Sequence, residues 1–229
     1  MESGPLRIII DSPINKRFAG LEKSCREFLE RIPSKASSFL MSVLAKRKIM
    51  IFVGLPTSPI HMYLACHATT GFYDRSKRSI LLYYVKDFEN IFFRTLIHET
   101  GHVYFESFAR VRNNASMDEL ILHKIVDELA ANYFVFKFKC DKEFTKYTEE
   151  LVNFFSGHIV MDGKSYHMIY IIIPRVISYV LYRSSSAVEK NLEEIVMENK
   201  KLILTLKSIP DKTLRKSAVG ALYSVGLIN

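Results

Sequence analysis

Several residue types are missing or scarce in this sequence of 229 residues. Neither glutamine nor tryptophan occurs, whereas lysine, glutamate and isoleucine are abundant, a bias typical of proteins from thermophiles. Cysteine is also scarce, because the chain has only Cys25, Cys66 and Cys140. Their odd number and wide spacing argue against a disulfide framework and against a thiolate zinc knuckle.

Long hydrophobic runs are absent as well. The longest apolar run, residues 168–182, contains Pro174 and Arg175 and is too short to cross a bilayer. The first five residues contain neither the basic region nor the start of the apolar region of a secretory signal peptide. We therefore expect a cytoplasmic protein with no membrane partner.

Charge of one sign is not concentrated anywhere, although the formal net charge is +8. The basic residues are scattered along the chain, and no run of them is dense enough to indicate a nucleic-acid-binding arm. A nucleic acid partner is thus compatible with the charge but not indicated by it. The oligomeric state cannot be inferred from the sequence.

The hydrophobic pattern predicts strands first and then mostly helices. Short β-branched runs predict strands at residues 6–10, 48–54, 61–68 and 79–85. Amphipathic periodicity and capping residues predict helices at 14–32, 36–45, 88–107, 116–139, 142–155, 175–183, 187–207 and 211–225, and 166–173 is either strand or helix. This order indicates an α+β fold, with an α/β lobe at 1–108 and a helical lobe at 109–229.

The motif His98-Glu99-x-x-His102 lies in the helix predicted at 88–107, for which Asp87 is the expected N-cap. On a helix the two imidazoles are offset by about 40°, so both project from one face. Apolar residues cover more than one face of this helix, and polar groups buried there are costly unless something compensates them. A zinc ion held by both histidines, with Glu99 near a zinc-bound water, would provide that compensation.

Zinc with two histidine ligands needs a third protein ligand, which leaves one position for water. The metzincin extension is absent, because Phe105 and Phe108 occupy its glycine and histidine positions. The remaining candidates are Glu106, His123, Asp127 and Glu128. Glu128 is favoured, because Asn132 follows it at i+4 on the same face and can form an outer-shell hydrogen bond to a zinc histidine.

The residues from about Gly71 to Phe138 resemble the gluzincin metallopeptidases, in particular the ImmA/IrrE-type intracellular proteases and the small archaeal gluzincins. The likeness lies in a strand pair, Thr-Leu-Ile-His98-Glu99-Thr-Gly-His102, and then Glu128-x-x-Ala131-Asn132. Ala130 departs from the acidic residue common in such proteases. The resemblance implies a zincin-like lobe in which His98, His102 and Glu128 bind Zn2+, Glu99 is the general base and Asn132 supports a ligand. It also implies that the hairpin at residues 71–84 lays out a peptide substrate.

The function expected from these residues is zinc-dependent hydrolysis of peptide bonds. Donors for the tetrahedral oxyanion are expected from the segment after the zinc helices, where Tyr166 and His167 rank ahead of His158. One alternative is a non-catalytic, zinc-stabilised binding or regulatory module. Another is a DNA-associated protease of the SprT-like kind, which would need His123 as the third ligand.

Overall fold

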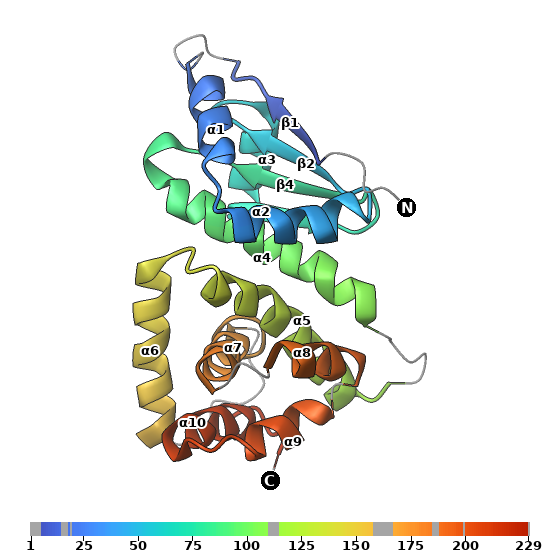
Figure 1. Ribbon diagram of the computed structural model, residues 1–229, viewed down its shortest axis with the longest axis vertical. Coiled ribbons are helices and arrows are strands. Elements are labelled where there is room, and N and C mark those ends of the chain that lie inside the picture. Colours follow the sequence, from blue (N-terminus) through green and yellow to red (C-terminus); the bar gives the residue numbers. More distant parts are fainter. Residues whose placement is uncertain are drawn as a thin grey trace. The chain divides into compact units, whose positions relative to one another are not determined.

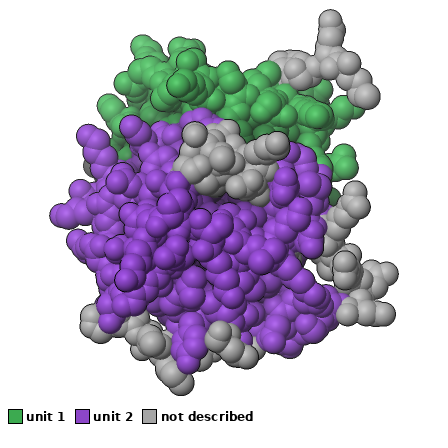
Figure 2. Space-filling model, turned by 60° about the horizontal axis from the view of Figure 1, so that its bottom comes forward, with its two compact units in different colours: residues 1–103 green, residues 104–229 purple. Residues whose placement is uncertain are grey.

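The structure is a computed structural model that describes residues 6–14, 18, 20–109, 115–157, 167–184, 188–198 and 200–228 (Figure 1). The chain forms two compact units, Met1–Val103 and Tyr104–Asn229, which Figure 2 colours separately. The first unit contains a four-stranded sheet with helices, and the described part of the second unit is helical. The predicted α+β class is confirmed.

The sheet of the first unit is mixed. Its strands are β1 (Arg7–Asp11), β2 (Met50–Gly54), β3 (Gly71–Asp74) and β4 (Ser79–Tyr83), in the order β1-β2-β4-β3. The strands β1, β2 and β4 run parallel, whereas β3 is antiparallel to β4 and forms one edge. The predicted strands at 6–10, 48–54 and 79–85 and the hairpin at the sheet edge are therefore present.

The two faces of this sheet differ in burial. Ile51 pairs with Ile80, and Val53 with Leu82, so these four fully buried side chains form one face. Helix α4 (Glu89–Phe108) packs on this face, where Gly71 of β3 approaches it. The opposite face is less covered, and a row of apolar side chains in register crosses it: Ile9, Phe52, Leu81 and Phe72.

The prediction of a strand at residues 61–68 was wrong, because Pro59–Cys66 form helix α3. Ser58 is the N-cap, and its side-chain oxygen accepts a hydrogen bond from the main-chain N–H of His61 at 3.2 Å. Pro59 has the fixed φ that suits the first helical position and has no N–H to leave unpaired. These two residues start a helix even though the segment that follows is apolar enough to suggest a strand.

The other helices of the first unit largely match their predicted places. They are α1 (Leu21–Glu30), α2 (Ser34–Leu40), the π-helix η2 (Met41–Ala45), the 3-10 helix η3 (Lys86–Phe88) and α4. The start of the helix predicted at 14–32 falls partly outside the described residues. Asp87 lies inside η3 rather than at a helix N-cap, so its predicted capping role was wrong.

The second unit contains seven helical segments within its described residues. They are α5 (Met117–Lys137), α6 (Lys142–Gly157), the π-helix η4 (Met168–Ile172), α7 (Ile173–Ser184), α8 (Val188–Met197), α9 (Lys201–Lys207) and α10 (Lys212–Tyr223). The predicted capping box at Ser116 and Glu119 is confirmed. The segment 166–173, for which strand and helix were both open, is helical in its described part, and the single helix predicted at 187–207 is two helices.

Helix α7 holds the second unit together, since it packs against α5, α6 and α10 (Figure 1). The ring of Phe136 in α5 meets that of Tyr179 in α7 edge to face, with centroids 5.3 Å apart. Ser178 of α7 donates a buried hydrogen bond to the carbonyl of Leu129 at 3.1 Å. This packing fixes the middle of α5, the helix that carries Glu128.

The longest helices, α4 with 20 residues and α5 with 21, both carry several charged side chains. Among the described residues, no helix combines the length and the apolar character needed to cross a membrane.

Replacing Ser58 with alanine should lower the free energy of unfolding by about 1 kcal/mol, because the first turn of α3 loses its cap. Urea unfolding followed by circular dichroism measures this change. The matched control is Ser38→Ala, since Ser38 is exposed inside α2 and alanine favours a helix. Equal stability of the Ser58→Ala variant and the wild type would contradict the proposed role of Ser58.

Candidate metal centre

Helix α4 places the two imidazoles of the motif against each other. The Nε2 atoms of His98 and His102 lie 3.2 Å apart, and the rings are nearly perpendicular, with centroids 4.9 Å apart. Two nitrogens that bind one tetrahedral zinc ion at its usual bond length are separated by about 3.3 Å. The observed spacing therefore fits a shared ion.

The last turn of α4 packs on α5. The ring of Tyr104 lies edge-on to that of Phe134, and the ring of Phe105 lies edge-on to that of His123, each with centroids 4.9 Å apart. These two ring contacts lie within the second unit, which begins at Tyr104.

Glu128 of α5 completes a cluster with the two histidines. His98, His102 and Glu128 are half-buried, and each offers a ligand atom that lies within 4.8 Å of the others. Two imidazole nitrogens and a carboxylate oxygen form a donor set for a divalent metal ion. These three residues could therefore hold a metal ion, as the sequence led us to expect.

Glu99 follows His98 in α4. It is only 8% exposed, and its Cγ would lie 3.4 Å from a methyl group added at Gly71 of the edge strand β3. In the His-Glu-x-x-His pattern a glutamate at this position is the candidate general base.

Lys124 is a member of the site that the sequence analysis missed. Its Nζ lies 3.1 Å from Oε1 of Glu128 and 2.9 Å from Oδ2 of Asp127. Burial alone would lower the pKa of Lys124, but the two carboxylates outweigh it and hold that pKa above its ordinary value. The signal was in the sequence, because a lysine three and four residues before two acids faces both on a helix.

Asn132, predicted to support a zinc ligand, is buried one turn after Glu128. Its side-chain amide donates a hydrogen bond to the main-chain carbonyl of Glu128 at 2.9 Å. Asn132 is thus tied to the backbone at Glu128, the candidate third ligand. The predicted hydrogen bond from Asn132 to a histidine stays a prediction.

The other candidates for the third ligand have different surroundings. The ring of His123 packs against Phe105, and Asp127 is bound to Lys124. Glu106 lies half-buried in the last turn of α4. In the described part of the chain, Glu128 is the acid that joins the histidines in a metal-binding group.

The predicted oxyanion donors are not brought to the cluster by any described contact. Tyr166 and His158 lie outside the described residues, and His167 is exposed at the start of η4. Tyr170 follows in the same π-helix, and Nζ of Lys124 lies 5.5 Å from the centre of its ring. The described contacts therefore connect Tyr170, through Lys124, to Glu128.

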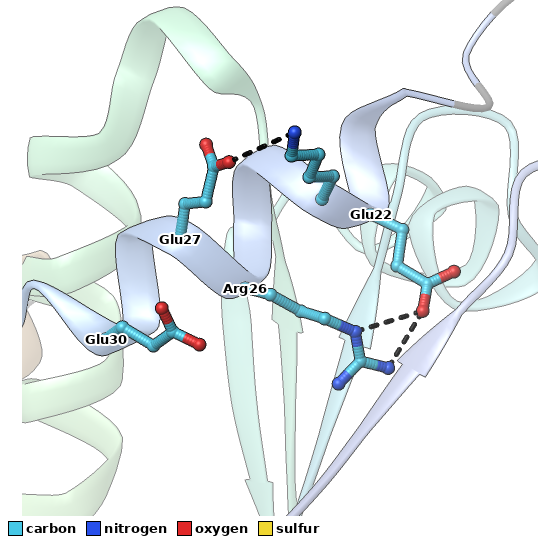
Figure 3. Close-up of a pocket in the computed structure, with 5 residues that line it drawn as sticks. Glu22, Arg26, Glu27 and Glu30 are labelled. Atoms are coloured by element: carbon cyan, nitrogen blue, oxygen red, sulfur yellow. Dashed lines mark hydrogen bonds and ion pairs between the residues drawn. The ribbon is translucent and has the colours of Figure 1, made fainter.

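A shallow hollow beside α1 has no chemistry of this kind (Figure 3). It is lined by residues of that one helix, Glu22, Lys23, Arg26, Glu27 and Glu30. Arg26 pairs with Glu22 at 2.8 Å and Lys23 with Glu27 at 3.7 Å, so these charges largely balance one another at the surface.

Comparisons of the chain with protein-family models, with curated proteins and with solved structures find no match.

Replacing Glu128 with glutamine should weaken Zn2+ binding more than about 100-fold, because loss of an outer-shell partner alone commonly costs 10- to 100-fold. Competition with a coloured chelator measures the affinity. Glu106→Gln is the matched control, since it removes the same charge from α4 outside the cluster, and its affinity should stay within a few-fold of wild type. Equal affinities of the two variants would remove Glu128 from the ligand set.

Proposed function

We propose that this protein is a zinc-dependent metallopeptidase of the gluzincin type. The observation that supports this most directly is the group of His98, His102 and Glu128. Glu99, which follows His98 in the chain, is buried. Two histidines and one glutamate are the ligand set of a known class of catalytic zinc sites, which keep one position for water or substrate. A purely structural zinc site is usually closed by four protein ligands.

When bound, zinc would lower the pKa of a water molecule and polarise the scissile carbonyl of a peptide. Glu99 would accept the proton of the attacking water and deliver it to the nitrogen of the leaving amine. Its low exposure favours this role, since few solvent molecules compete for the carboxylate. Lys124 would hold one oxygen of Glu128 and leave the other free to bind the ion.

The edge strand β3 is the proposed binding place for the peptide. In the described sheet it pairs only with β4, so its second edge is open to an added strand. A strand added there would run beside the residues that approach α4 near Glu99. The antiparallel edge strand, the central strand β4 and the motif helix α4 follow one another in the chain, which supports the proposed zincin-like arrangement of this lobe.

The variant Glu99→Gln should keep Zn2+ and lose cleavage of an unstructured protein such as casein by about 10²- to 10⁴-fold, the usual contribution of a general base. Glutamine has the shape of glutamate but cannot accept the proton. The control is Glu89→Gln, which changes the first residue of the same helix. Full activity in Glu99→Gln would refute the proposed base.

Removing the metal with a chelator should abolish cleavage and leave the far-ultraviolet circular dichroism at 25 °C unchanged. The reason is that both units have buried apolar cores away from the ligands, such as Val53 paired with Leu82 in the sheet and Phe136 packed against Tyr179. Added Zn2+ should restore cleavage and raise the melting temperature, because an ion that binds only the folded state stabilises it. Unfolding on chelation would instead indicate the alternative, a zinc-stabilised binding module.

A further inference from the structure

The main chain of the edge strand β3 touches α4 at Gly71. A methyl group in place of the glycine hydrogen would lie 2.3 Å from Cγ2 of Thr95, 3.0 Å from Cδ2 of Leu82 and 3.4 Å from Cγ of Glu99. The first distance is far below a van der Waals contact between carbons. Any side chain at position 71 must therefore push β3 away from α4 or displace Thr95.

Thr95 is held firmly in this contact. Its hydroxyl donates to the carbonyl of Ile91 at 2.8 Å and lies 3.0 Å from the hydroxyl of Thr70. With the oxygen fixed in this way and the side chain 7% exposed, the methyl group has one place to go, against Gly71. The contact between the methyl group of Thr95 and the main chain of Gly71 thus sets the distance between β3 and α4.

This spacing bears directly on Glu99. Thr95 and Glu99 are four residues apart on one helix face, so both side chains point toward the end of β3 where Gly71 lies. The backbone of Gly71 borders the side chain of Glu99 at Cγ. A shift of β3 at this point would change the direction of the Glu99 carboxylate and its distance from a peptide laid along β3.

We propose that Gly71 is a positioning residue for Glu99. Its contact with the methyl group of Thr95 keeps the general base at a fixed position relative to the edge strand β3. The inference rests on the proposed peptidase function and adds to it the residue pair that aligns substrate and base. Displacements of about 1 Å can cost 10²-fold in rate, so one methyl group is large enough to matter.

The test moves a methyl group across the contact. Gly71→Ala adds a methyl on the strand side, and Thr95→Ser removes one from the helix side while keeping the hydroxyl. We expect kcat on casein to fall about 10- to 100-fold in Gly71→Ala and several-fold in Thr95→Ser, with KM and Zn2+ affinity nearly unchanged. The double variant should regain most of kcat, because the methyl added at position 71 takes the place of the one removed at 95.

The control is Gly20→Ala, since a methyl group there meets no atom within 4 Å, and it should behave as wild type. Unchanged kcat in Gly71→Ala, or a folded double variant that stays as slow as Gly71→Ala, overturns the inference and leaves the peptidase proposal intact. If Gly71→Ala does not fold, unchanged kcat in Thr95→Ser overturns it. A wild-type protein that cleaves nothing overturns the proposed function itself and with it this role.

Discussion

Partial burial of polar side chains in an apolar helix is the constraint on which the site depends. Glu99 is buried and His98 and His102 are half-buried, in a helix whose Leu96 and Ile97 are almost fully buried. An uncompensated polar group costs about 1–3 kcal/mol when fully buried, and partial exposure lowers that cost. The imidazoles meet each other at 3.2 Å and share their surroundings with a carboxylate from α5. The two imidazoles and the carboxylate therefore compensate one another for lost contact with water. A cation bound by all three groups would complete this compensation.

Each partner of α4 fixes a different part of the site. The sheet holds the middle of the helix, through Gly71 and the hydroxyl pair of Thr70 and Thr95, and so sets the place of Glu99, the proposed general base. Helix α5 packs on the last turn, through the rings of Phe134 and His123, and carries Glu128, the proposed third ligand.

Local signals predicted the elements of the site well. The spacing of His98 and His102 predicts a helix, and the capping box at Ser116 fixes the start of the helix that carries Glu128. Two features were not predicted, one set by a local signal and one by a tertiary contact. Residues 61–68 have the apolar content of a strand, yet Ser58 and the proline after it start a helix there. The approach of Gly71 to Thr95 joins residues far apart in the chain, so no local pattern reveals it.

The formal charges beside Glu128 favour a cation. Glu128 and Asp127 are two negative charges and Lys124 is one positive charge, so one negative charge remains. Asp127 is 2% exposed, so water screens this charge poorly. Two acids adjacent in sequence on α5 would repel each other, but Lys124 lies within 3.1 Å of both. A cation bound by Glu128 and the histidines would balance the remaining charge, and the lysine would keep the neighbouring Asp127 from competing for the ion.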